Sequence, residues 1–174
     1  MVRKIIIVAI AVAALGAGAF LWRTDGNTKI QNEIIITREP AVVFEYVTTP
    51  RNWPNWHPAS KAVSGATDHS LAVGEKVTED FVVAGRAGKV VWTVVKRDPP
   101  REWVIDGDVE GHKAGTVTYS LTPVTDGTRF ERELTYPARN LLFAILNRIS
   151  IKSRVEEESD RAVHTLKRVL ETRS

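Results

Sequence analysis

Two charged residues fall at positions where the surrounding pattern places apolar side chains. Glu79 alternates in phase with Phe81, and Arg132 alternates in phase with Leu134. A charge on a buried face is costly unless it is paired. One interpretation is that both residues project into an internal cavity and hold the polar group of an otherwise apolar ligand. The other is that a bulge or an edge position returns each of them to solvent.

Aromatic and imidazole side chains could complete such a cavity. Tyr119 and Tyr136 would supply hydroxyl groups, or would belong to the core with the hydroxyl at its rim. His57 ends a turn that holds two tryptophans and could face the mouth of the cavity. Trp92 and Trp103 are expected in its wall and in the core. In an enzyme that used this cavity, Glu79, Arg132 and His57 would take part in proton transfer.

Other kinds of chemistry find little support in the sequence. The four histidines have no metal-ligand spacing, and His164 follows Asp160 by one helical turn, as in a solvated pair. The chain has no cysteine, which excludes disulfides and thiolate nucleophiles. It also lacks a nucleophile elbow and a phosphate-binding loop. We therefore expect no metal and no cofactor.

Composition favours one globular domain with a proper core. Of the 174 residues, 43% are hydrophobic and 26% are charged, which suits a single domain with a small appendage. The formal net charge is +3, and basic residues are interleaved with acidic ones. No basic stripe that could follow a phosphate backbone is present, so nucleic acid is not an expected partner.

Periodicity predicts an α+β domain with its helices on one side of a sheet. A short helix should open at Pro40, followed by a compact turn with two tryptophans at residues 53–58. A long amphipathic helix is predicted over 153–171, with Ser153 and Glu156 as its capping box. Strands are predicted at 29–37, 74–83, 86–96, 103–109, 116–122 and 130–136.

Two stretches resemble a known group of proteins. Residues 39–47 (EPAVVFEYV) with 50–58 (PRNWPNWHP) resemble the opening of the START-like superfamily, and residues 133–136 with 165–171 resemble its ending. Within that superfamily the chain is similar to the polyketide cyclase/dehydrase group of SRPBCC proteins. The resemblance covers roughly residues 29–171. It implies a helix-grip fold, in which a curved antiparallel sheet wraps the C-terminal helix around a cavity, and some members carry an N-terminal membrane segment. Members include lipid and hydrophobic-ligand binders as well as cyclases.

The N-terminal segment has the features of a membrane helix. No residue from Ile5 to Trp22 is charged, and a helix of that length spans roughly 27 Å. A cleaved signal peptide is the alternative, with a cleavage site at residues 17–19, but the long apolar run favours an uncleaved anchor. Arg3 and Lys4 predict a cytoplasmic N-terminus and an extracytoplasmic domain. The expected organisation is an anchor at 1–23, a linker at 24–28 and the domain at 29–174.

A basic, apolar run before the final helix allows two further interpretations. It is either the first half of the gripped helix, covering the cavity, or a lid or membrane-surface patch, because basic amphipathic helices bind anionic interfaces. Its apolar residues are Leu141, Leu142, Ile145, Leu146 and Ile149.

Three functions are consistent with these patterns. We favour a membrane-anchored, non-catalytic protein that binds a lipid or other hydrophobic small molecule in the cavity. The alternatives are a cyclase- or hydrolase-type enzyme that uses the same cavity and an interaction module with a filled core. The sequence identifies neither the ligand nor the oligomeric state.

Overall fold

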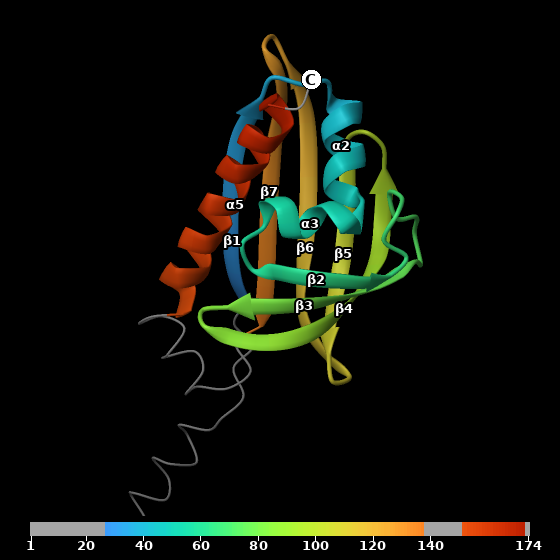
Figure 1. Cartoon of the computed structure of the whole chain (residues 1–174), viewed down its shortest axis with the longest axis vertical. Helices are drawn as coiled ribbons and strands as arrows, with labels where there is room; N and C mark the ends of the chain where they lie inside the picture. Colours follow the sequence, from blue (N-terminus) through green and yellow to red (C-terminus); the bar gives the residue numbers. More distant parts are fainter. Residues whose placement is uncertain (1–26, 138–150, 173–174) are drawn as a thin grey trace, which may run out of the picture.

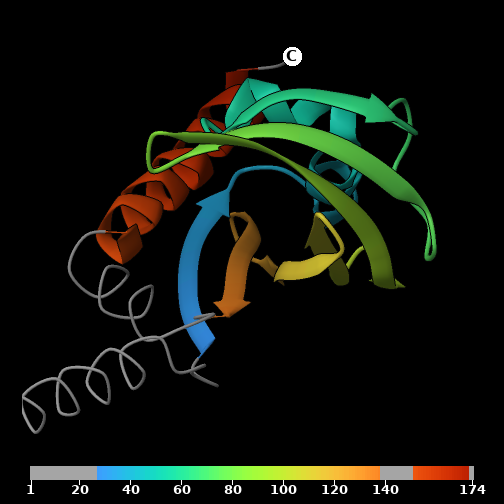
Figure 2. The ribbon, with the colours of Figure 1, turned by 90° about the horizontal axis from the view of Figure 1, so that it is seen from below.

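A curved antiparallel sheet wraps around one side of a long helix (Figures 1 and 2). The computed structural model describes residues 27–137 and 151–172. In this part the sheet has seven strands in the order β1-β7-β6-β5-β4-β3-β2. The strands are β1 (Asn27–Ile36), β2 (Ser60–Gly65), β3 (Lys76–Val83), β4 (Arg86–Asp98), β5 (Glu102–Val109), β6 (His112–Val124) and β7 (Gly127–Pro137). This architecture confirms the predicted α+β, helix-grip type of fold.

The register of the sheet places one set of alternating side chains on its concave face. Arg132 on β7 lies opposite both Asn32 on β1 and Tyr119 on β6. On the other half of the sheet, Val77 on β3 lies opposite Trp92 on β4. Because successive strand residues point to opposite faces, all of these side chains share the concave face.

Short helices cover one end of this concave face. They are α2 (Pro40–Thr48), the 3-10 helix η1 (Pro50–Asn52) and α3 (Trp53–Trp56). Proline opens α2 as predicted, because its fixed φ suits the first helical turn. Beneath the helices lies a cluster of rings that we name the aromatic plug: Trp53, Trp56, Trp103, Tyr119 and Phe130. Within it, Trp103 stacks on Tyr119 with ring centroids 5.4 Å apart.

The long helix α5 (Lys152–Thr172) packs beside β1. Its buried stripe consists of Val155, Ser159, Ala162, Val163, Leu166 and Leu170, as expected for the amphipathic helix predicted over 153–171. Its C-terminal end is tied to the end of β1, where Lys167 Nζ donates to the Ile35 carbonyl at 2.7 Å and Arg38 Nε donates to the Leu170 carbonyl at 3.0 Å. The predicted capping box is wrong, because Ser153 lies inside the helix, which already includes Lys152.

One strand and the start of another differ most clearly from the sequence-based expectation. Strand β2 was not predicted, because its six residues are mostly exposed and its only apolar residues are Ala62 and Val63. It pairs with β3 at the edge of the sheet, with a register shift between Ser60 and Ala62. Strand β1 begins at Asn27, so the last two residues of the predicted linker 24–28 lie in the sheet.

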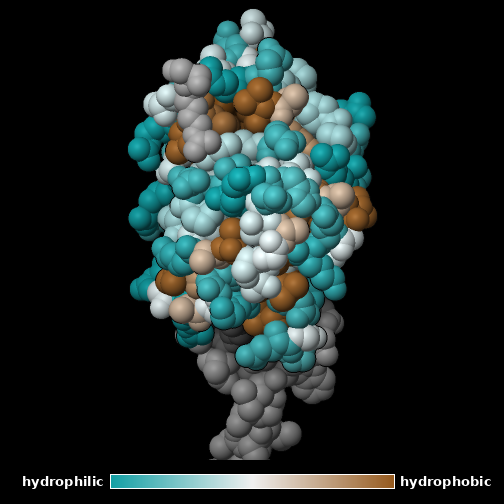
Figure 3. Space-filling model, turned by 45° about the vertical axis from the view of Figure 1, so that its right-hand side comes forward, coloured by the Kyte–Doolittle hydropathy of each residue, from teal (hydrophilic) through white to brown (hydrophobic). Residues whose placement is uncertain are grey.

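The predicted membrane segment, residues 5–22, lies outside the described residues, as do Leu141, Leu142, Ile145, Leu146 and Ile149. Within the described part, the helices are too short or too polar to cross a bilayer. The large exposed apolar residues of the described part belong to several different elements: Ile35, Val42, Val73, Val91 and Val95. On the face drawn in Figure 3, apolar residues form small groups among hydrophilic ones.

Candidate functional site

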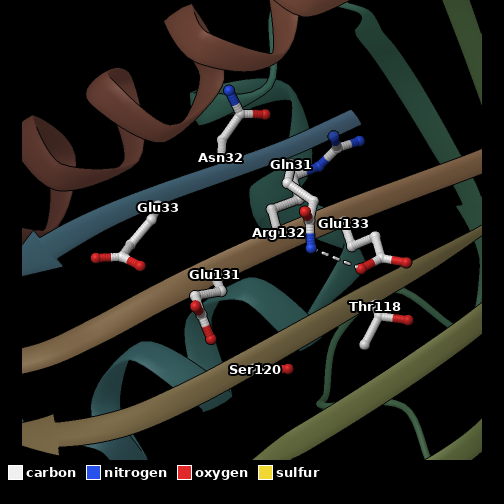
Figure 4. A pocket seen from close by; sticks show the side chains of 8 residues that line it. All are labelled: Gln31, Asn32, Glu33, Thr118, Ser120, Glu131, Arg132 and Glu133. Atoms are coloured by element: carbon white, nitrogen blue, oxygen red, sulfur yellow. Dashed lines mark hydrogen bonds between the residues drawn. The ribbon is translucent and has the colours of Figure 1, made fainter. Parts of the chain in front are cut away.

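A buried arginine joins three separate elements on the concave face. Arg132 is only 6% exposed, and its Nη1 donates to Ser159 Oγ of α5 at 2.8 Å. The Ser159 hydroxyl in turn donates to Asn32 Oδ1 on β1. Figure 4 shows Asn32 on the side of the sheet where α5 lies. The Arg132 side chain therefore points into the interior and is not returned to solvent, as the alternative interpretation had it.

A carboxyl group faces the same interior from β3. Trp92 Nε1 donates to Glu79 Oε2 at 2.7 Å, which places Glu79 inward as well. Burial raises the pKa of Glu79, while the neighbouring Ser60 hydroxyl, the hydrogen bond from Trp92 and the charge of Arg132 lower it in part. Because the net effect is a raised pKa, the Glu79 carboxyl stays protonated to a higher pH than the carboxyl of an exposed glutamate does.

The imidazole of His57 is the third titratable group in this interior, beside Arg132 and Glu79. His57 follows α3, and the Ala59 amide donates to its Nδ1 at 3.3 Å, so the neutral ring carries its proton on Nε2. Burial, with a smaller contribution from the charge of Arg132, holds the pKa of His57 well below its ordinary value. The ring is therefore neutral at physiological pH. We name Asn32, His57, Ser60, Glu79, Arg132 and Ser159 the interior polar cluster.

Three buried N–H groups in this region have no hydrogen-bond partner among the described residues. They are Nε1 of Trp56, Nε2 of His57 and Nε of Arg132. The Trp56 and His57 rings lie 5.4 Å apart, and Trp56 also contacts Tyr119, which faces Arg132 across the sheet. An unpartnered buried donor costs about 1–3 kcal/mol. Each of the three donors suits an oxygen acceptor such as a carboxylate or a polarised carbonyl.

Tyr119 lies between the aromatic plug and the interior polar cluster. Burial raises the pKa of its hydroxyl to about 12, with the charge of Arg132 opposing the shift and that of Glu79 adding to it. The phenol is therefore protonated throughout the physiological range.

The structure brings together most of the residues that the sequence proposed for a site. His57, Glu79, Trp92, Tyr119 and Arg132 lie around one interior region. Trp103 is different, because it is fully buried in the aromatic plug. Tyr136 lies farther along β7, opposite Thr28, and is half-buried. That any of these residues binds a ligand stays a prediction.

Sequence reasoning missed four contributors to this region. Asn32 alternates in phase with Ile30 and Ile34, and Ser159 falls in the apolar stripe of α5, so each was a polar residue at an apolar position. That signal could have found both. Ser60 gave no such signal, because β2 itself was not recognised, and Trp56 was predicted only as part of the compact turn at residues 53–58.

A groove on the opposite, convex face is a poor candidate for the site. It encloses about 250 Å³ over β1, β6 and β7, and its convex-face side chains are those of Gln31, Glu33, Thr118, Ser120, Glu131 and Glu133 (Figure 4). Asn32 and Arg132 also border it, although their side chains point to the concave face. Several of its polar groups already satisfy one another, since Gln31 Nε2 donates to Glu133 Oε2 at 2.9 Å and Lys29 Nζ lies 2.7 Å from the same carboxylate. The groove therefore offers paired surface groups instead of unsatisfied ones. No set of three potential metal ligands gathers within residues 27–137 and 151–172.

Comparison with known proteins agrees with this geometry. Residues 27–171 match the family described as polyketide cyclase/dehydrase and lipid transport. The chain belongs to this family. This confirms the family resemblance seen in the sequence.

One relative in this polyketide cyclase/dehydrase family is penitrem biosynthesis cluster 1 protein I of Penicillium ochrochloron. It is 34% identical over 113 residues, which cover 61% of this chain and 74% of that protein. Among solved structures, TTHA0849 from Thermus thermophilus superposes with a TM-score of 0.66 at 16% identity, covering 84% of this chain and all of that one. MLL2253 from Mesorhizobium loti gives 0.63 at 16% identity, covering 84% and 99%. At these identities the structural likeness shows the fold alone.

Proposed function

We propose that the domain binds a hydrophobic small molecule between the concave face of the sheet and α5, and that it holds an oxygen of this ligand with the interior polar cluster. One observation carries the proposal. Arg132 is buried on a mostly apolar face, and its Nε–H, like the N–H groups of Trp56 and His57 in the same interior region, has no partner among the described residues. A ligand with an apolar body and one acceptor oxygen would satisfy these donors.

The energetics support a ligand role for Arg132. Replacing a buried charge by a well-packed apolar residue is often neutral or stabilising, so folding alone gives little reason for an arginine here. The family description names cyclases, dehydrases and lipid transport, all of which handle hydrophobic molecules, and the penitrem-cluster relative is named for a biosynthetic gene cluster.

The test compares two arginines on the same strand. The full chain and its Arg132→Met and Arg129→Met variants are purified and extracted into organic solvent, and the extracts are analysed by mass spectrometry. Arg129 is exposed on the convex face and pairs with Glu33, so it is the matched control. We expect a co-purified hydrophobic molecule in the parent and in Arg129→Met, with retention reduced roughly tenfold or more in Arg132→Met. Empty extracts from all three proteins, or equal retention, would contradict the proposal.

A second candidate is an enzyme of the cyclase type that uses the same interior. It is favoured by the combination of a carboxyl with a raised pKa, Glu79, and a neutral imidazole, His57, in one interior region. In this function the N–H donors would stabilise negative charge on a substrate oxygen while one of these groups moves a proton. Glu79→Gln would then abolish turnover of the extracted molecule while leaving its retention nearly unchanged. Unchanged turnover would exclude Glu79 from proton transfer.

The N-terminal segment suggests on which side of a membrane the domain lies. We propose that residues 5–22 anchor the protein in a membrane with the domain on the extracytoplasmic side, and that the run from Leu141 to Ile149 is a lid or contacts the membrane surface. The support is the uncharged length of the first segment and the basic, apolar character of the second. N-terminal sequencing of the purified protein tests the anchor, since a chain that begins at Phe20 would indicate a cleaved signal peptide instead.

A further inference from the structure

The loop between β2 and β3, residues 66–75, holds a histidine between two carboxylates on the side of the domain away from α5 (Figures 1 and 2). Nδ1 of His69 lies 2.9 Å from Asp68 Oδ1, and its Nε2 lies 3.0 Å from Glu75 Oε2. An ionised carboxylate only accepts hydrogen bonds, so both ring nitrogens must donate, which only the protonated imidazolium can do. We name Asp68, His69 and Glu75 the imidazolium clasp.

The charges around the clasp favour its ionised form. The hydrogen bonds to Asp68 and Glu75 raise the pKa of His69. The hydrogen bond from His69 lowers the pKa of Asp68, to which the charge of Arg51 on η1 also contributes. The hydrogen bonds from the Ala72 amide and from His69 lower the pKa of Glu75. All three groups of the clasp are therefore charged in mildly acidic solution.

Between its ends the loop places one side chain in the core. Leu71 is fully buried, and its carbonyl accepts from Trp103 Nε1 of the aromatic plug at 3.4 Å. Beside it, Ser70 Oγ lies 2.6 Å from Thr48 Oγ1 and accepts from Arg97 Nη2 at 3.3 Å, so Arg97 is the charged group that faces the loop from β4. The two carboxylates of the clasp come before and after Leu71 in the chain, so the clasp closes the loop around the inserted leucine.

The two ends of the loop are held by groups that do not titrate. The Arg51 amide donates to the Thr67 carbonyl at 3.0 Å, and the Gly74 amide donates to the Val94 carbonyl at 2.9 Å. Opening of the clasp would therefore loosen the segment between these two anchors and leave the strands on either side paired.

We propose that the imidazolium clasp is a pH-sensitive switch, which holds Leu71 in the core while His69 is protonated and loosens the loop when His69 loses its proton. A neutral imidazole has one N–H and one lone pair. The lone pair would face a carboxylate oxygen, so one of the two links becomes repulsive. Leu71 then leaves its place beside Trp103 more often, which exposes one side of the aromatic plug. The switch lies outside the interior polar cluster and works whether or not the interior holds a ligand.

The sign of the pH dependence follows from the direction of the shift. A folded-state pKa raised above the ordinary 6.5 gives a stabilisation that is complete below that value and is lost as the pH rises through the folded-state value. The lowered pKa values of Asp68 and Glu75 keep both acceptors ionised on the acidic side of this range.

Hydrogen–deuterium exchange of the full chain tests the switch. Protection of the amides in residues 66–75 is measured at about pH 5.5 and at about pH 8.5, and each value is corrected for the intrinsic exchange rate at that pH. We expect protection to be roughly threefold lower at the higher pH, since exposed charge pairs contribute modestly. Equal protection at both pH values would overturn the proposal.

Two histidine variants show whether the clasp is responsible. His69→Gln should give the same protection of the loop at both pH values. His164→Gln is the matched control, because His164 is also exposed but lies 3.8 Å from a single carboxylate, that of Asp160. It should leave the pH dependence of the loop unchanged. A pH dependence that persists in His69→Gln would overturn the proposal.

Titration of the His69 ring by NMR gives an independent readout. Its pKa should lie above the ordinary value of an imidazole and should fall in Glu75→Gln, which removes one of the two charges that stabilise the imidazolium. The glutamine oxygen can still accept from the Ala72 amide, so the turn is kept. A pKa of His69 at or below the ordinary value, or one unchanged in Glu75→Gln, would show that the clasp does not form in solution.

Discussion

The aromatic plug and the interior polar cluster share one face of the same sheet but are built in opposite ways. In the plug the rings pack on one another and two of the three indole N–H groups are satisfied, since Trp53 Nε1 donates to the Val47 carbonyl at 2.8 Å and Trp103 Nε1 to that of Leu71 at 3.4 Å, whereas Trp56 Nε1 has no partner among the described residues. In the polar cluster a cation is buried, and the Arg132 and His57 donors have no partner among the described residues. Tyr119 and Arg132 stand directly opposite each other at the boundary.

The contrast separates residues that stabilise the fold from residues that reduce its stability. Packed rings bury apolar area and contribute strongly to folding. Buried unpartnered donors and charges cost free energy, and proteins retain such groups mainly where function needs them. If this division is correct, substitutions on the two sides of the boundary should affect stability and binding in different proportions.

The largest loss of stability is expected for Trp103→Ala in the plug. Trp103 is fully buried and contacts Trp53 and Tyr119, so its removal should lower the free energy of unfolding by about 3–5 kcal/mol. Urea denaturation measures this. A loss below about 1 kcal/mol would show that the plug is not the main stabilising region.

A smaller loss is expected for Ser159→Ala, on the polar side. This hydroxyl accepts from Arg132 and donates to Asn32, and its removal should cost about 1–3 kcal/mol because it leaves buried polar groups unpaired. Retention of the co-purified ligand should fall as well, since Arg132 loses its positioning contact. Ser64→Ala on the exposed side of β2 is the control and should change neither quantity. Lost stability with fully preserved retention would remove Ser159 from the site.

Glu171→Gln provides a reference outside both regions. The hydrogen bond from Lys167 and the one from the Thr37 amide lower the pKa of Glu171 to about 2. A lowered folded-state pKa gives stability that is present above the ordinary pKa of the carboxyl and is lost as the pH falls toward 2. We expect Glu171→Gln to cost about 0.5–1 kcal/mol at pH 7 because the carboxylate is partly exposed. The difference from the parent should narrow between pH 5 and pH 3 in thermal unfolding, and a constant difference would contradict this.

Glu79→Gln should have the smallest effect on stability and the opposite pH dependence. The folded-state pKa of Glu79 is raised, so the ionised carboxyl reduces stability increasingly as the pH rises above its ordinary value. The variant should therefore gain stability relative to the parent at neutral pH and lose that gain near pH 4. Glu131→Gln on the convex face is the matched control and should show no such trend. If instead the stability of Glu79→Gln relative to the parent increased as the pH falls, the Glu79 carboxyl would not be buried in its neutral form.

Much of this division was predictable from the sequence. Alternation along the strands placed Glu79 and Arg132 on the concave face, and the 3.6-residue period gave the buried stripe of α5. The partners of Arg132 were not predictable, because they depend on which residue of α5 and β1 stands across from it. The contact between Trp92 and Gly107 was equally hidden, since a glycine in β5 acquires its meaning only once Trp92 of β4 is known to lie on it. Strand β2 lacked the apolar alternation on which strand prediction relies.

The pairing of the first strand with the last has a consequence during synthesis. Within the described residues strand β1 pairs only with β7, and 90 residues (37–126) separate the two strands, which a ribosome adds in roughly 5–18 s. Until then the run Ile34-Ile35-Ile36 has emerged without its partner strand, and α5, which ties down the end of β1, is made later still. An unpaired apolar strand edge is prone to aggregation. The nascent chain should therefore depend on a chaperone during this interval more than the finished domain does.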